Sequence, residues 1–137
     1  NLLKKSIEKF QVQSATLKLK ELVDKAVIIN NIRFVSGQIE TDSANVLKNI
    51  ANQIRASSDN TVMVIGSESG GKASILVTVS DNLVKERNIN AVEIIEEISG
   101  EINGDGGGQP FMATAGGKNP KGIEQAIEKA SQFLQRS

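Results

Sequence analysis

Residues 104–117, with the sequence GDGGGQPFMATAGG, hold six of the twelve glycines of this 137-residue chain and decide how its C-terminal half is built. Three consecutive glycines accept positive φ angles and let a second backbone approach closely. Small residues on both sides of Met112 keep the surface flat. Two interpretations stay open from physics alone. The stretch is either a tight corner between strands, or a contact for phosphate or ribose in which Lys118 and Lys121 supply positive charge beside a helix that begins at Pro120.

The segments around this stretch predict alternating strands and helices. We expect one strand within 27–40, entered through a turn at Asn30-Asn31, and two strands at 61–65 and 73–79, joined by a hairpin at 69–71. A helix capped by Thr41 or Asp42 follows the first strand, and Asn90 and Asn119-Pro120 start two more helices. Their apolar faces are Ala44, Leu47, Ile50, Ala51 and Ile54; Val92, Ile94, Ile95, Ile98 and Ile102; and Ile123, Ala126, Ile127, Ala130 and Phe133.

Residues 1–26 contain no Gly or Pro and predict a long N-terminal helix. Part of its apolar stripe follows the 3,4 spacing of a coiled-coil seam over two heptads, so it predicts either oligomerisation or packing on its own domain. The residues of the stripe are Leu3, Ile7, Phe10, Val12, Ala15, Leu19 and Leu22. We therefore divide the chain into a helical segment, 1–26, and a globular domain, 27–137. The order β-α-β-β-α-β-α after the helix indicates an α/β (α+β) fold, a small mixed-sheet sandwich.

The composition excludes most familiar active sites. The chain has no His and no Cys, which removes thiolate nucleophiles, His-based proton relays and zinc sites built from these residues. Lys plus Arg and Asp plus Glu both number 16, so a nucleic-acid site must be local, and the basic segments are 1–26 and 118–137. No apolar run is long enough to span a membrane. Because the first residue is Asn1 rather than Met, we expect a longer parent protein.

Two motifs that suggest ligands have simpler explanations. Residues 66–72 match the start of a phosphate-binding P-loop, but Ala73 stands where Ser or Thr must reach magnesium, and a strand is expected to follow instead of a helix. We expect a hairpin tip. The acidic residues Glu93, Glu96, Glu97 and Glu101 lie opposite the isoleucine stripe of their helix and indicate a solvated face rather than a metal site.

The glycine-rich stretch resembles the signature near the C-terminus of alanyl-tRNA synthetases, in the DHH-associated domain. The matching residues are Gly106, Gly107, Gly108, Pro110, Met112, Ala113, Ala115, Gly116 and Gly117. The chain departs from the signature at Asp105, Gln109, Phe111 and Thr114, which leaves this version less basic. The order of the expected helices and strands also resembles the family over nearly the whole chain.

This resemblance implies a non-catalytic, cytoplasmic module that binds alanine tRNA at its outer corner, where the D and T loops meet, and supports aminoacylation and editing. It also implies a homodimer, formed through the N-terminal helix or the globular domain. ATP-dependent alanine ligation, with ATP, Mg²⁺ and Zn²⁺, belongs to upstream domains of the same chain, so no cofactor and no metal are expected here. The expected RNA-binding residues are Gly106, Gly107, Gly108, Gln109, Pro110, Met112, Ala113, Thr114, Gly116, Gly117, Lys118 and Lys121.

The sequence leaves two alternatives open. DHH-family phosphoesterases carry a related nucleic-acid-binding domain, but their glycine segment usually contains a His, where this chain has Gln109. The other alternative is a pure oligomerisation module, in which the N-terminal helix pairs across a dimer and the globular part makes no contact with RNA.

Overall fold

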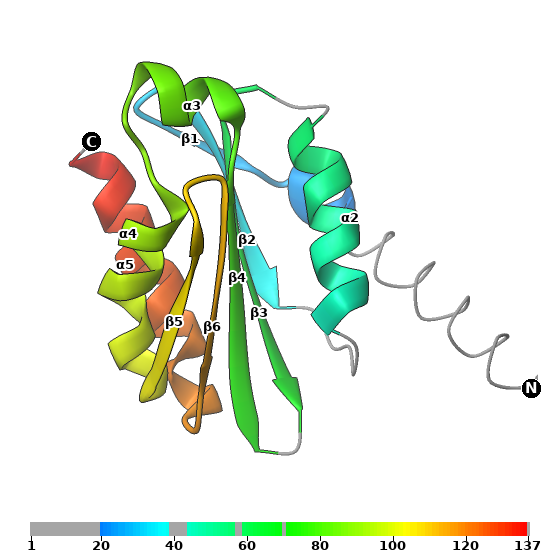
Figure 1. Ribbon diagram of the computed structural model, residues 1–137, viewed down its shortest axis with the longest axis vertical. Coiled ribbons are helices and arrows are strands. Elements are labelled where there is room, and N and C mark those ends of the chain that lie inside the picture. The colour runs from blue at the N-terminus through cyan, green and yellow to red at the C-terminus, as the bar shows by residue number, and fades with distance from the viewer. Residues whose placement is uncertain (1–19, 39–43, 57–58, 70, 137) are drawn as a thin grey trace, which may run out of the picture.

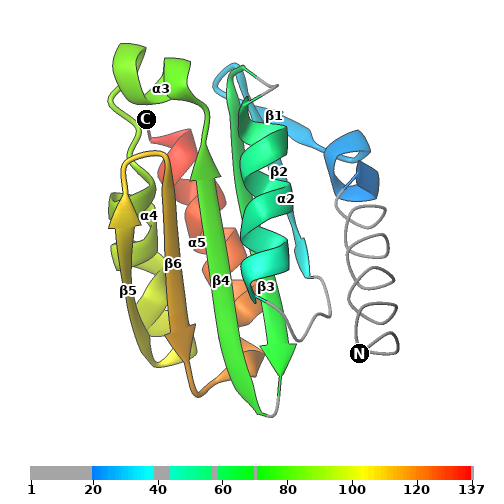
Figure 2. The same ribbon diagram turned by 45° about the vertical axis from the view of Figure 1, so that its right-hand side comes forward.

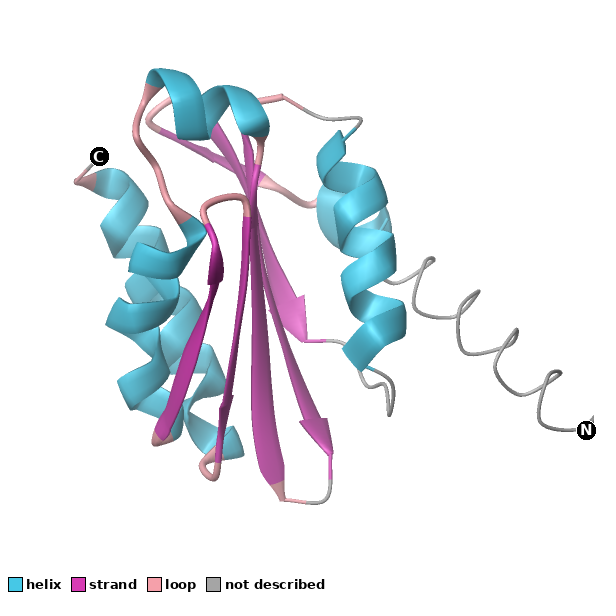
Figure 3. Cartoon of the chain, viewed as in Figure 1, coloured by secondary structure: helices cyan, strands magenta, loops and turns pink. Residues whose placement is uncertain are grey.

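The computed structural model describes residues 20–38, 44–56, 59–69 and 71–136, which form a layered α/β fold (Figures 1 and 3). Residues 20–24 are helical. The named elements are β1 (Val27–Ile29), β2 (Ile32–Gln38), α2 (Ala44–Ala56), β3 (Thr61–Ser69), β4 (Lys72–Val79), α3 (Asp81–Glu86), α4 (Ala91–Ile98), the 3₁₀ helix η1 (Ser99–Ile102), β5 (Gly104–Gln109), β6 (Met112–Gly117), the 3₁₀ helix η2 (Pro120–Gly122) and α5 (Ile123–Gln135).

The strands form one mixed sheet in the order β1-β2-β3-β4-β6-β5. Among the described strands, only β2 and β3 pair in parallel, and the other neighbours are antiparallel. A parallel pair needs a crossover connection, and α2 supplies it. Helices α4 and α5 cover one face of the sheet, whereas α2 lies against the other face near β3 and β4 (Figure 2). The expected mixed-sheet α/β class is confirmed, with more strands than predicted.

Apolar residues alternate along the strands and build one core on each face of the sheet, as the two-residue period of a strand requires. Val62, Val64, Val77 and Ile75 belong to the larger core beneath α4 and α5, together with Ile94, Ile95, Ile98 and Ile123. Val35, Met63, Ile65 and Leu76 belong to the smaller core, which includes Ala51 of α2. Within the predicted helix faces, Ile54, Val92, Ile127 and Phe133 are only partly buried, and the side chains of Ala44, Leu47 and Ile50 lie outside the described residues.

The segment 27–40 forms two strands, where the sequence predicted one. Asn30 and Asn31 both have positive φ, 51° and 65°, and join β1 to β2 in a two-residue hairpin. Asparagine tolerates this left-handed conformation better than most residues, and such turns match the twist of paired strands. The Asn-Asn pair was therefore the signal of a hairpin, and its first arm is the edge strand β1.

The glycine-rich stretch also forms two strands, where the predicted order of elements has one, and the turn between them is the tight strand-to-strand corner of one of the two interpretations. β5 and β6 pair from Gln109 and Met112 at the tip to Gly104 and Gly117 at the open end, with Pro110 and Phe111 as the turn. The hairpin predicted at 69–71 is present between β3 and β4, with Gly71 at φ +79°. Residues 66–69 lie in β3 and Lys72 begins β4, so the P-loop-like motif precedes no helix.

The N-termini of the helices agree in part with those predicted from the sequence. The side chain of Asn90 accepts a hydrogen bond from the Val92 N–H at 2.8 Å and caps α4. Asn119 holds the predicted position before Pro120 but makes no side-chain cap; its side-chain Nδ2 donates instead to the Glu101 carbonyl oxygen at 3.1 Å. Helix α3 was not predicted.

The predicted N-terminal seam lies almost wholly outside the described residues, as do Thr41 and Asp42. Leu22 is described, and it is partly buried against the smaller core together with Val23 and Ala26. At this position the stripe therefore packs on its own domain, which is one of the two expected outcomes.

Candidate functional site

The β5–β6 hairpin presents one face to the larger core and the other to the side of the sheet where α2 lies. Ala113 and Ala115 are buried in the core beneath α4 and α5. Thr114, between them, pairs with Leu76 of β4 and with Gly107 of β5. Directly paired residues share a face of an antiparallel sheet. Because Leu76 packs in the smaller core, Thr114 and Gly107 also face the α2 side, and so do the paired residues Ser74 and Gly116.

The glycines of the hairpin fall into two groups according to what a Cβ atom would meet. A Cβ on Gly106 would lie 2.3 Å from the Thr114 carbonyl oxygen, and Gly104, Gly108 and Gly117 would meet backbone atoms just as closely. These four glycines are needed for close packing of the chain. A Cβ on Gly107 would meet no atom within 4 Å, and one on Gly116 would reach only the Ala73 carbonyl oxygen, at 4.0 Å. Packing therefore requires glycine at neither of these two positions.

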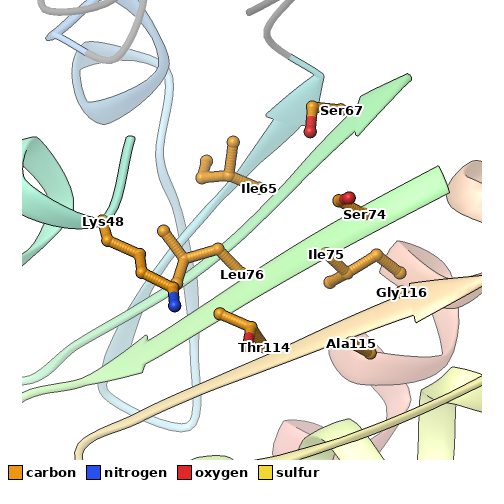
Figure 4. A pocket seen from close by; sticks show the side chains of 9 residues that line it. All are labelled: Lys48, Ile65, Ser67, Ser74, Ile75, Leu76, Thr114, Ala115 and Gly116. Carbon is orange, nitrogen blue, oxygen red and sulfur yellow. The ribbon is translucent and has the colours of Figure 1, made fainter. Parts of the chain in front are cut away.

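Two adjoining hollows lie over this face, between the hairpin and α2. One, of about 190 Å³, is lined by Lys48, Ile65, Ser67, Ser74, Ile75, Leu76, Thr114, Ala115 and Gly116. The other, of about 240 Å³, is lined by Lys48, Gly107, Gly108, Gln109, Phe111, Met112, Ala113 and Thr114. Lys48 and Thr114 are shared, so the hollows form one shallow groove, which we call the α2 groove. Figure 4 shows Lys48 reaching from α2 toward β4 and β6, with its nitrogen near Leu76 and Thr114.

The groove brings together only part of the predicted RNA-binding set. Gly107, Gln109, Met112, Thr114 and Gly116 line it and face the α2 side. By the same alternation Gly106 and Gly108 face the larger core, where Ala113 is buried, and Gly117 is packed against Ile102. Pro110 is exposed at the hairpin tip.

The two predicted lysines lie elsewhere. Lys118 directly follows β6, and Lys121 belongs to η2. Both lysines are exposed, and both lie at the end of the hairpin that is opposite its turn at 110–111. Neither lines the groove. Sequence reasoning missed Lys48, and no local signal could have found it, because its approach to the hairpin depends on how α2 packs on the sheet.

The acidic residues of α4 and η1 are partly used for packing between helices. Glu97 pairs with Arg136 at 2.9 Å and Glu101 with Lys129 at 3.3 Å, whereas Glu93 and Glu96 are exposed. Within the described residues, no cluster of acidic side chains is arranged to hold a metal ion. None of the described helices is both long and apolar enough to cross a membrane.

The chain matches the DHHA1 domain family over residues 31–136, which include the whole sheet except β1 and the first turn residue. The chain belongs to this family. Alanine-tRNA ligase of Cytophaga hutchinsonii is 34% identical over 134 residues, 98% of this chain and 15% of the relative. That of Christiangramia forsetii is 38% identical over 132 residues, 96% of this chain and again 15% of the relative. This DHHA1 domain therefore spans 15% of the length of each of these enzymes.

A solved structure agrees with the sequence relatives. The C-Ala domain of alanyl-tRNA synthetase from Aquifex aeolicus superposes with a TM-score of 0.74 at 26% identity, covering 80% of this chain and 97% of that domain. The DHHA1 domain described here thus has the fold of a C-Ala domain, which confirms the family resemblance seen in the glycine-rich stretch.

Proposed function

We propose that the chain is the tRNA-binding and dimerisation module of an alanyl-tRNA synthetase, without catalytic activity of its own. The family membership and the likeness to a C-Ala domain support this assignment. The observation that carries it is the open face of the β5–β6 hairpin, where Gly107 and Gly116 leave bare backbone beside a lysine. Glycine lets a ligand approach the backbone closely, and phosphate contacts position a protein on nucleic acid.

The module contacts the outer corner of alanine tRNA and helps the aminoacylation and editing centres share one tRNA. Those centres, with their ATP, Mg²⁺ and Zn²⁺, lie in other domains of a cytoplasmic parent. Lys118 and Lys121 supply further phosphate contacts at the open end of the hairpin. Replacing both with Ala makes the dependence of log affinity on log salt less steep, by about one unit of slope per lost phosphate contact.

The second part of the proposal is dimerisation, carried by the stripe from Leu3 to Leu19, since Leu22 packs on its own domain, or by the globular domain. Sedimentation equilibrium of the chain measures this directly. If the variant with both Ile7→Asp and Leu19→Asp keeps the mass of a dimer, the contact lies in the globular domain. If this variant has the mass of a monomer, the contact lies in the helix. A strictly monomeric chain contradicts this part of the proposal.

The decisive experiment is equilibrium binding of the chain to folded alanine tRNA and to a single-stranded RNA of equal length, each at two salt concentrations. Preference for the folded tRNA supports the synthetase module. Preference for the single strand favours a phosphoesterase-type domain instead. If the chain binds neither RNA but dimerises, it is an oligomerisation module and the tRNA-binding proposal is wrong.

A further inference from the structure

Lys48 has an unusual position among the cations of this domain. It is half-buried on the side of α2 that faces β4 and β6, and both hollows of the α2 groove include it. Among the described residues that line the groove, Lys48 carries the only charge. Its ammonium makes no ion pair with any residue in the described ranges. A cation held over a groove in this way attracts an anionic occupant.

The floor of the groove is unusually bare. Gly107 and Gly116 present no side chains toward α2, although a Cβ would fit at both positions, and Ser74 and Thr114 add only small polar groups. Bare backbone costs a strand stability, because glycine loses more freedom on folding than other residues. No contact among the described residues requires glycine at these two positions. A flat sugar or base ring lying on the floor would fill the space that the missing side chains leave.

The size of the groove indicates what kind of molecule fits. Each hollow alone, at about 190 or 240 Å³, is smaller than the roughly 300–1,000 Å³ of sites that enclose a small metabolite, and only the two together reach that range. They are also open, running along the sheet from Gln109 and Met112 at one end to Ser67 and Gly116 at the other. A unit of a polymer, which an open groove can hold without enclosing it, suits this shape better than a free small molecule.

We propose that the α2 groove binds one nucleotide unit of the RNA, with its phosphate beside the Lys48 ammonium and its sugar or base flat on the floor formed by Gly107, Thr114 and Gly116. This inference rests on the proposed tRNA-binding function and names a cation within it that is distinct from Lys118 and Lys121. Asp105 is exposed and pairs with Gly116 at the outer edge of the same face, so its charge disfavours a phosphate there and favours one beside Lys48.

The test compares variants of the full 137-residue chain in binding to folded alanine tRNA at several salt concentrations. Lys48→Gln reduces the magnitude of the slope of log affinity against log salt by about one unit, as expected for one lost phosphate contact. Gly107→Val and Gly116→Val cover the floor and weaken binding roughly tenfold, while the salt slope stays unchanged because no charge is lost. Circular dichroism melting of each variant shows whether it folds like the wild type.

Matched controls separate the groove from general effects. Lys129→Gln removes the same charge from α5, on the opposite face of the sheet, and Gly100→Val adds the same side chain where a Cβ also meets no atom within 4 Å. Both controls should leave tRNA affinity within about twofold of the wild type, since neither reaches the RNA.

The outcomes distinguish the two proposals. If the wild type binds no tRNA, the proposed function itself is wrong. If the wild type binds and the Lys48 and glycine variants bind equally well, tRNA contacts another surface and only the groove proposal is overturned. If Gly107→Val changes the sedimentation mass of the chain without changing tRNA affinity, the groove is a contact between copies of the chain, and a nucleotide does not occupy it.

Discussion

The difference between Gly106 and Gly107 leads to a sharp prediction about stability. These neighbours on β5 look interchangeable in the sequence, but their missing side chains would point to opposite faces of the sheet. A Cβ on Gly106 would lie 2.3 Å from the Thr114 carbonyl oxygen and 2.7 Å from the Ala115 Cα, whereas a Cβ on Gly107 meets open space. We predict that Gly106→Ala destabilises the domain strongly and that Gly107→Ala does not.

The magnitude follows from which atoms must move. The atoms that a Cβ on Gly106 would meet belong mostly to the backbone of β6, so no change of rotamer relieves the clash and the two strands must separate locally. Overpacking of this kind costs about 1–3 kcal/mol, and each weakened hydrogen bond of the ladder adds about 0.5–1.5 kcal/mol. We therefore expect a loss of about 3 kcal/mol for Gly106→Ala. Gly107→Ala should raise stability by about 0.4–1 kcal/mol, because alanine restricts the unfolded chain.

Urea unfolding of the two variants and the wild type, followed by circular dichroism, provides the measurement. With an m-value of about 2 kcal/mol per M, Gly106→Ala lowers the unfolding midpoint by roughly 1.5 M, and Gly107→Ala raises it slightly. An unchanged m-value is the control that the unfolded state is the same. If the two midpoints lie within about 0.3 M of each other, which is about 0.6 kcal/mol at this m-value, the distinction between structural and open glycines is refuted.

Two further predictions concern other parts of the domain. The Asn30 side chain donates hydrogen bonds at 2.9 Å to the carbonyl oxygens of Leu134 and Gln135 at the end of α5, so Asn30→Gly should cost about 1–2 kcal/mol in thermal or urea unfolding. Asn31→Gly is the matched control, because it also has positive φ, and it should change stability by less than about 0.5 kcal/mol; equal losses would show that the turn alone matters. Asp105→Asn should raise tRNA affinity roughly two- to fourfold, since an exposed charge is worth about 0.2–1 kcal/mol, and unchanged affinity would place Asp105 outside the interface.

Local patterns in the sequence were enough to predict most elements of the central sheet and the cores. The alternation from Ala73 to Val79, the capping side chain of Asn90 and the apolar face around Ile123 each depend on neighbours along the chain, and each was confirmed. The hairpin of β5 and β6 was harder to predict, because a run of glycines shows no alternation of polar and apolar residues. Strand β1 is only three residues long, which is too short to show an alternation of polar and apolar residues.

The candidate site could be predicted only in outline. The glycine-rich stretch was visible, but which of its residues face outward depends on register, and the pairing of Thr114 with both Leu76 and Gly107 is known only from the folded sheet. Lys48 belongs to a helix that is distant in sequence and has an ordinary composition. Its place over the groove depends on the crossover between β2 and β3, which no pattern around Lys48 encodes.

Helix α5 also determines when this domain can fold during synthesis. Ile123, Ala126, Ala130 and Leu134 are fully buried against strands made much earlier, and Asn30 closes the last turn of the same helix. Until α5 has left the ribosome, the sheet exposes the apolar face that this helix covers. Domains fold as units while the chain grows, so the nascent chain must keep this face from other apolar surfaces until α5 is free to pack on it.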